Sequence, residues 1–270
     1  MSVFQELGAG VFRRRYESLD LNIGVVFGAE AVLLVDSRAS HRQADQLRDE
    51  LVTLTDLPIG WVINTHFHWD HTWGNARFPE AALWGHEHCL LEMIDNGEAA
   101  RRGVLELMPV EHHDAVNEVT ITPPTETFAS SALLDIGGRV VELRYHGLGH
   151  TNSDIVVRVA DAGVLFAGDL IEQGAPPAFG DSYPLDWGQT LDSIVLEATM
   201  VPGHGDVVDA GFVATQQGEI EAIADMAREG HSEGLPVEAL VGNGPYPPET
   251  LHSAISRAYL QLDGELGYVD

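Results

Sequence analysis

Residues 65–75 read THFHWDHTWGN and directly follow the short apolar run 61–63. Three histidines and one aspartate fall within six positions of this stretch: His66, His68, Asp70 and His71. The apolar run predicts a buried strand, so we expect the cluster on a loop at the strand's C-terminal end. In extended backbone, residues i and i+2 project to the same side, which lets His66 and His68 bind one ion. Asp70 and His71 lie just beyond and can reach a second ion.

The residue types favour a metal site over a packing or surface role. Imidazole suits zinc, and a carboxylate is a common further ligand. A lone histidine more often packs or faces solvent, but the H-x-H-x-D-H pattern after a buried strand is typical of metal ligands. The string WGHEHC at 84–89 also looks metal-like. It opens a predicted helix, where positions i and i+2 diverge, so we expect structural roles for its histidines.

Further ligands must come from elsewhere in the chain. Three candidates share one setting, because each follows a predicted strand and adjoins glycine: His150 after Gly149, Asp169 after Gly168, and His204 between Gly203 and Gly205. Glycine lets the backbone turn sharply and approach an ion closely. Each pair is common by itself, but together they supply the ligands that the first cluster lacks.

Short apolar runs and helical spacing alternate along the chain. The predicted strands are 21–27, 31–35, 61–64, 81–84, 133–136, 139–145, 154–159, 164–167 and 199–201. The predicted helices are 40–54, with Ser40 as N-cap, 86–96, 185–197, 211–228, 236–240 and 248–262. Residues 103–130 are interrupted by prolines and are expected to form an irregular excursion. Strands in two batches, each followed by helix, predict a layered α/β fold of two packed sheets.

The order HFHWDH, His150, Asp169 and PGHG resembles the metallo-β-lactamase superfamily over about residues 21–205. The resemblance implies that fold, a four-layer αβ/βα sandwich of two mixed β-sheets with helices outside. We expect residues 1–210 to form the catalytic domain and 211–270 a C-terminal helical extension packed on it. The motifs are specific for the fold and the metal site. They are poorly specific for substrate, because members hydrolyse lactams, thioesters, lactones, phosphodiesters and sulfate esters.

The resemblance also implies the roles of individual residues. His66, His68 and His150 would bind one Zn²⁺, Asp70, His71 and His204 a second, and Asp169 would bridge them. Asp36, after the second predicted strand, would accept a hydrogen bond from a ligand histidine without binding metal itself. The bridging position is usually cysteine or serine in zinc β-lactamases, and aspartate in the thioesterase, lactonase and nuclease branches. Those lactamases often hold the substrate carboxylate with lysine, and this chain has none.

These assignments predict a zinc-dependent hydrolase in which a metal-bridging hydroxide cleaves a small acyl substrate: an ester, thioester, lactone or β-lactam. Asp70 is expected to orient the hydroxide and move its proton. Tyr183, in the loop after Asp169, is a candidate donor to the developing oxyanion. The alternative is an iron-dependent oxidoreductase resembling persulfide dioxygenases on the same fold.

Composition limits the partners. The 270 residues carry a formal charge of −28, and all 14 basic residues are arginine. Such a chain repels nucleic-acid backbones and anionic membranes, so we expect a small-molecule substrate and leave the oligomeric state open. No run of 18 apolar residues is present, and the N-terminus lacks the apolar core of a secretory signal. Cys89 is the single cysteine, which fits a reducing, cytoplasmic location.

Overall fold

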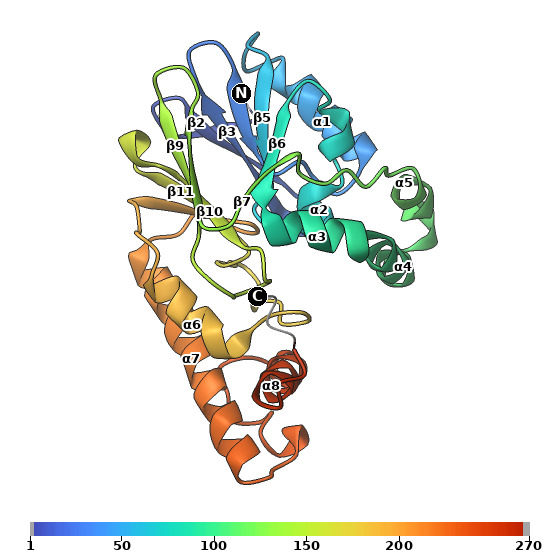
Figure 1. Ribbon diagram of the computed structural model, residues 1–270, viewed down its shortest axis with the longest axis vertical. Helices are drawn as coiled ribbons and strands as arrows, with labels where there is room; N and C mark the ends of the chain where they lie inside the picture. Colours follow the sequence, from blue (N-terminus) through green and yellow to red (C-terminus); the bar gives the residue numbers. More distant parts are fainter. Residues whose placement is uncertain (1–2, 267–270) are drawn as a thin grey trace.

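The computed structural model describes residues 3–266, in which strands form two packed sheets with helices on both outer faces (Figure 1). The first sheet has the strand order β1-β2-β3-β4-β5-β6-β7. Its strands are β1 (Gln5–Gly8), β2 (Val11–Tyr16), β3 (Leu21–Phe27), β4 (Val32–Val35), β5 (Ile59–Ile63), β6 (Ala82–His86) and β7 (Glu126–Phe128). Pairing is antiparallel from β1 to β4 and parallel from β4 to β7. The parallel strands β4 and β5 therefore end at the same edge of the sheet.

The second sheet has the order β12-β11-β10-β9-β8. Its strands are β8 (Ser131–Asp135), β9 (Val140–Tyr145), β10 (Ile155–Val159), β11 (Val164–Gly168) and β12 (Thr199–Pro202). Pairing is antiparallel except between β11 and β12, which run parallel. Both sheets are therefore mixed. The segments that follow β11 and β12 leave the sheet side by side.

Three apolar cores separate four layers. Between the sheets, side chains such as Leu33 and Ile63 of the first sheet pack with Leu143 and Phe166 of the second. The outer face of the first sheet packs against α1 (His41–Leu51). The outer face of the second packs against α6 (Pro184–Asp192), α7 (Ala210–Ser232) and α8 (Pro248–Leu262). The predicted αβ/βα sandwich of two mixed sheets is confirmed.

Most predicted elements are present, but the N-terminus and the region 103–130 differ from expectation. β1 and β2 were not predicted. Helix α4 (Gly97–Leu107) continues into the excursion that we expected to be irregular, and α5 (His113–Asn117) lies inside it. Val104 of α4 is buried, and the side chain of Arg101 donates to the backbone oxygens of Val116 and Val119. These tertiary contacts stabilise a helix that the local pattern did not indicate.

The remaining helices are α2 (Trp69–Thr72) and α3 (Glu87–Asp95). In Figure 1, α7 and α8 extend beyond the sheets at the lower end of the view. Their apolar residues nevertheless share one core with β10, β11 and β12. The division of the chain at residue 210 stays a prediction. Within residues 3–266, no helix is long and apolar enough to cross a membrane.

Candidate metal centre

All seven predicted metal ligands lie together, and each follows the end of a strand. The loop after β5 carries His66 and His68, and α2 carries Asp70 and His71. His150 comes from the loop between β9 and β10. Asp169 and His204 directly follow the parallel strands β11 and β12. The fold thus brings chain segments from both sheets to one edge of the sandwich.

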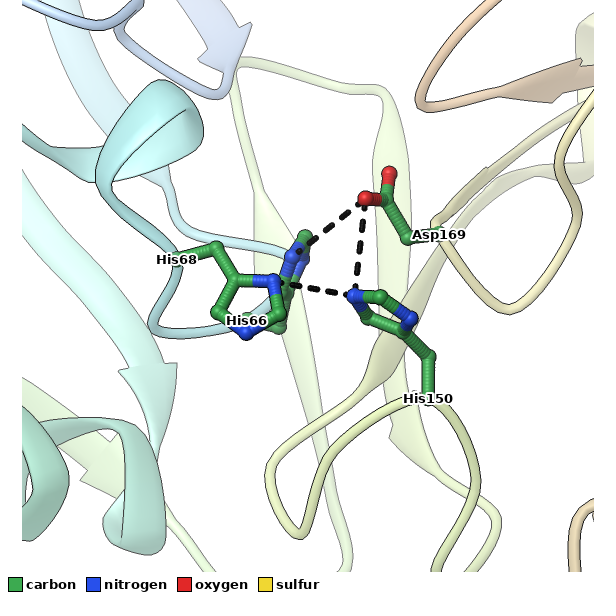
Figure 2. Close-up of side chains that lie close together, drawn as sticks. All are labelled: His66, His68, His150 and Asp169. Carbon is green, nitrogen blue, oxygen red and sulfur yellow. Dashed lines mark hydrogen bonds and ion pairs between the residues drawn. The ribbon is translucent and has the colours of Figure 1, made fainter. Parts of the chain in front are cut away.

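The first ligand group consists of His66, His68, His150 and Asp169, whose nearest ligand atoms lie within 4.8 Å of one another. Figure 2 shows the three imidazoles and the carboxylate pointing toward a common centre. His150 Nε2 lies 2.9 Å from His68 Nδ1 and 3.5 Å from Asp169 Oδ2. His66 Nε2 lies 3.7 Å from Asp169 Oδ2. Three imidazole nitrogens and one carboxylate oxygen form a donor set that suits zinc.

The second group consists of Asp70, His71 and His204. His204 Nε2 lies 3.3 Å from both Asp70 Oδ2 and His71 Nε2. Asp169 stands between the two groups, because its carboxylate oxygens lie 3.3 Å from His71 Nε2 and 3.4 Å from His204 Nε2. One carboxylate that faces both groups is the arrangement expected of a bridging ligand in a two-ion site.

Two glycines make this close approach possible. A Cβ atom at Gly203 would lie 1.8 Å from Asp169 Oδ1, so any side chain there would displace the bridging carboxylate. Gly168 has a φ of +53° and sits against Thr65, where a Cβ atom would come within 2.8 Å. Glycine is therefore favoured at positions 168 and 203, beside candidate ligands, because a side chain at either position would clash.

Asp36 lies behind the loop after β5 and contacts Thr65 and His71. Its Oδ1 accepts a hydrogen bond from the backbone N–H of Thr65, and its Oδ2 accepts one from the Thr65 hydroxyl. Asp36 Oδ2 also lies 2.8 Å from His71 Nδ1, which leaves Nε2 of that ring facing the site. A carboxylate behind a ligand histidine fixes the orientation and tautomer of the ring.

Other groups hold the rings of His68, His150 and His204, and the Thr65 hydroxyl oxygen lies 3.1 Å from His66 Nδ1. Asp181 Oδ2 lies 2.9 Å from His68 Nε2, so this ring offers Nδ1 to the site. The carbonyl oxygens of Ala178 and Leu19 lie 3.1 and 2.7 Å from Nδ1 of His150 and His204, respectively. We did not predict Asp181 from the sequence. The available signal was a carboxylate two positions before Tyr183, in the same loop.

Burial and neighbouring charges divide the histidines into two kinds. Burial lowers the pKa of His66 well below its ordinary value and that of His150 to about 4. Burial also opposes the charged form of His68, but the Asp181 carboxylate outweighs it and raises the pKa to about 9. For His204, Asp169 and Asp70 outweigh burial and raise the pKa to about 12. Without metal, protons on His68 and His204 offset the negative charge of the neighbouring carboxylates.

Two buried atoms support the fit of a metal to this site. His66 Nε2 and Asp169 Oδ1 are inaccessible to solvent and make no hydrogen bond; their polar contacts are ion-pair distances of 3.7 Å to Asp169 Oδ2 and 3.3 Å to His71 Nε2, respectively. Such groups are costly to bury unless something binds them. Both atoms belong to candidate ligands and face the centre of the cluster. The seven residues therefore fit a pair of divalent cations, with His66 in the first group and Asp169 serving both.

A cleft of about 490 Å³ opens above the ligands, and His68, Asp70, His150, Asp169 and His204 line its floor. The cleft gives a small molecule access to both groups. Tyr183 is not among its lining residues. Its side chain is buried and lies near Arg257, with the guanidinium carbon 5.8 Å from the ring centre. The role of Tyr183 as an oxyanion donor stays a prediction.

The profile of the metallo-beta-lactamase superfamily matches residues 19–204, which span every ligand described above. The chain belongs to this superfamily. It is therefore a metal-dependent hydrolase of the metallo-β-lactamase fold, and its His/Asp clusters are typical of the family's dinuclear site.

Curated relatives have different activities. The type 2 metallo-beta-lactamase of Bacillus cereus is 26% identical over 208 residues, covering 73% of this chain and 72% of the relative. The acyl-coenzyme A thioesterase MBLAC2 of Gallus gallus is 28% identical over 228 residues, covering 76% and 80%. The linear primary-alkylsulfatase of a Pseudomonas strain is 25% identical, and the match covers 81% of this chain but 49% of the relative.

Solved structures share the fold at lower identity. The sec-alkylsulfatase Pisa1 of Pseudomonas sp. superposes with a TM-score of 0.75 at 17% identity, covering 97% of this chain. This chain spans half the length of that protein. The metallo-beta-lactamase FIM-1 of Pseudomonas aeruginosa, in its mono-zinc form, gives a TM-score of 0.63 at 19% identity, covering 81% of this chain and 94% of the enzyme. These similarities concern the fold and leave the substrate open.

Proposed function

We propose that this protein is a zinc-dependent hydrolase of a small acyl compound, namely an ester, thioester, lactone or β-lactam. The observation that carries the proposal is the position of Asp169 between two complete ligand groups on the floor of one cleft. Imidazole-rich groups completed by carboxylate favour zinc over magnesium or calcium. Aspartate at this position agrees with the thioesterase and lactonase branches of the family.

Two bound zinc ions would supply an activated water and polarise the substrate carbonyl. The protein's own contribution is to hold the ligands in place and to manage one proton. Asp36 and Asp181 fix the rings of His71 and His68. Asp70 lines the cleft, and its Oδ2 lies 3.3 Å from His204 Nε2 and 3.6 Å from His71 Nε2. An ionised carboxylate at the reacting centre can orient a water and accept its proton.

A substrate panel tests the proposal. Metal-loaded and chelated protein are compared on a chromogenic cephalosporin, a thioester, a homoserine lactone, an aryl ester and a phosphodiester. We expect turnover of at least one acyl substrate that chelation abolishes. Elemental analysis of protein expressed without added metal separates zinc from iron. Absence of chelator-sensitive acyl hydrolysis would contradict the proposal.

Variants of the ligands test the assigned roles. His68→Ala and Asp169→Ala should abolish hydrolysis and reduce the bound metal to one ion or none. Asp70→Asn should keep most of the metal but lose at least about 100-fold in kcat, within the usual contribution of proton transfer. His112→Ala is the matched control, because this exposed histidine lies outside both ligand groups. Full activity with unchanged metal content in His68→Ala or Asp169→Ala would refute the site.

The proposed partner is a small molecule rather than nucleic acid, because a formal charge of −28 opposes binding to phosphate backbones. A cytoplasmic location is proposed from the single cysteine, Cys89, which is buried and unpaired.

A further inference from the structure

The walls of the cleft beyond the seven ligands are apolar or acidic. Leu19, Trp69 and Ala175 supply apolar surface. Gln173 supplies an uncharged amide, and Asp20 and Glu172 supply carboxyl groups. No arginine is among the residues that line the cleft in the described part of the chain, and the sequence contains no lysine. The protein therefore offers a substrate no cationic side chain there.

Three arginines contact residues or segments at the cleft, and each already has hydrogen-bond partners. Arg15 pairs with the Asp20 carboxylate, with Nη2 2.9 Å from Oδ2, and also contacts Asp206. Arg13 donates to the carbonyl oxygen of Gly205. Arg257 donates to backbone oxygens of the loop that carries Asp181. An anionic group on a substrate would compete with these existing partners for the guanidinium groups.

A second hollow, of about 300 Å³, continues the cleft and has the same character. The two share Glu172, Gly174 and Ala175 as lining residues. Phe212 and Tyr246 line the continuation, and the one carboxylate added there is Glu219, which accepts a hydrogen bond from the Tyr246 hydroxyl. No arginine lines this hollow among residues 3–266. A substrate that extends away from the metal centre therefore meets apolar and acidic surface.

We propose that the cleft selects acyl substrates whose acyl and leaving groups carry no anionic group. This inference rests on the proposed hydrolysis. Bound metal ions would act most strongly on the reacting carbonyl, because Coulomb attraction falls with distance, so groups farther along the substrate depend mainly on the walls. A carboxylate placed there loses its water without gaining a cation, which is unfavourable. Substrates bearing a free carboxylate or phosphates are accordingly disfavoured, whereas simple esters, thioesters and lactones fit.

A matched pair of aryl esters tests the inference on the metal-loaded protein. 4-Nitrophenyl hexanoate and the 4-nitrophenyl monoester of adipic acid differ at the far end of the acyl chain by a carboxylate. We expect kcat/KM for the charged ester to be at least about tenfold lower, equivalent to about 1.4 kcal/mol. Equal or faster hydrolysis of the charged ester would overturn the inference.

Added cations separate the effect of the cleft from that of the protein's overall charge. Ala175→Arg places a guanidinium in the cleft, and Leu107→Arg places one at an exposed position on α4 outside it. Ala175→Gln controls for side-chain bulk. We expect Ala175→Arg to raise the ratio of kcat/KM for the charged ester to kcat/KM for the hexanoate about tenfold over the same ratio in Ala175→Gln. If Leu107→Arg gave the same gain, general charge rather than the cleft would be responsible, and the inference would fail.

Binding supplies a readout that does not require turnover. The 4-nitroanilides of hexanoic acid and of adipic acid serve as hydrolysis-resistant probes in ligand-observed NMR. Tighter binding of the uncharged anilide supports the inference even if neither ester is hydrolysed, in which case only the proposed hydrolase activity fails. Equal binding, or tighter binding of the carboxylate, would overturn the inference whatever the activity.

Discussion

Asp36 joins two parts of the metal-binding loop through one carboxylate. It accepts from the backbone and hydroxyl of Thr65 and holds the ring of His71. Its backbone adopts a φ of +67°, which is uncommon for a residue other than glycine. The side chain and the main chain are thus both adapted to this position, where β4 ends beside β5.

Replacement of Asp36 tests this role. Asp36→Asn removes the charge and one acceptor while keeping the shape, so His71 should lose its fixed orientation. We expect affinity for the ion bound by Asp70, His71 and His204 to fall about 10- to 100-fold, as is usual for such partners. The measurement is the zinc retained per chain in competition with a chelator. Asp45→Asn, at an exposed ion pair with Arg77, is the control. Unchanged zinc retention in Asp36→Asn would show that the Asp36 carboxylate is not needed to orient His71.

The candidate ligands could be selected from sequence because their types are distinctive and each follows a strand-like run, and the structure brings all seven together. Asp181 was not predicted, because its only signal was its place two positions before Tyr183, and a lone aspartate in a loop carries no periodicity. It acts only through a contact with His68, 113 positions earlier in the chain. The WGHEHC string at 84–89 is the opposite case, because its histidines look like ligands in the sequence but lie outside the candidate site. His86 Nε2 lies 2.9 Å from the Ala129 carbonyl oxygen, and neither His86 nor His88 belongs to a ligand group of the described residues.

Helix α8 reaches the metal site indirectly, although it lies outside the region that matches the family profile. Arg257 on this helix donates to the carbonyl oxygens of Asp181 and Ser182 at 2.9 and 3.0 Å. Asp181 in turn holds His68. The C-terminal segment therefore positions a ligand of the first group through two successive contacts.

This connection predicts the effect of changing Arg257. Arg257→Gln should leave the loop less well held and weaken zinc binding by up to about tenfold, less than the direct change Asp181→Asn. The two changes combined should cost less than their sum, because they act through one path. Arg228→Gln, on α7, is the matched control. Zinc affinity is measured by chelator competition. Full additivity in the double variant would contradict the proposed path.

Strands and helices with regular apolar spacing were predictable, whereas β1, β2 and β7 were not. β2 contains the triplet Arg13–Arg15, which hides its alternation. These side chains are accommodated by acidic partners such as Glu50 and Asp206, contributed by distant segments. β7 has three residues at the edge of its sheet and is largely exposed. In both cases tertiary contacts, rather than local preference, determine the strand.

The folding stability of the whole sandwich is expected to depend on the protonation and metal occupancy of the candidate site. The ligand groups sit where both sheets end, and several of their charged atoms are buried. In the absence of metal, protons on histidines offset the carboxylates, so pH and metal act on the same buried groups. The stability of the chelated protein should therefore fall as pH rises, while the stabilisation added by metal should grow.

Thermal unfolding tests this coupling. The pKa of His68 is raised from 6.5 to about 9, mainly by Asp181 against burial, and burial raises that of Glu172 from 4.5 to about 8. Raised values mean that the folded chain holds more protons than the unfolded chain. Their stabilisation is complete below the unfolded values and is lost as pH rises through the folded ones. We expect the Tm of chelated protein to fall between pH 6.5 and about 8.5.

Zinc should oppose this fall in Tm. Binding requires unprotonated imidazoles, so each proton that the metal displaces strengthens binding by about 1.4 kcal/mol per pH unit. The difference in Tm between zinc-loaded and chelated protein should therefore widen over the same range. Differential scanning fluorimetry at constant free zinc measures both curves. A chelated Tm that rose with pH, or a narrowing difference, would mean that the protons on these histidines do not compete with metal.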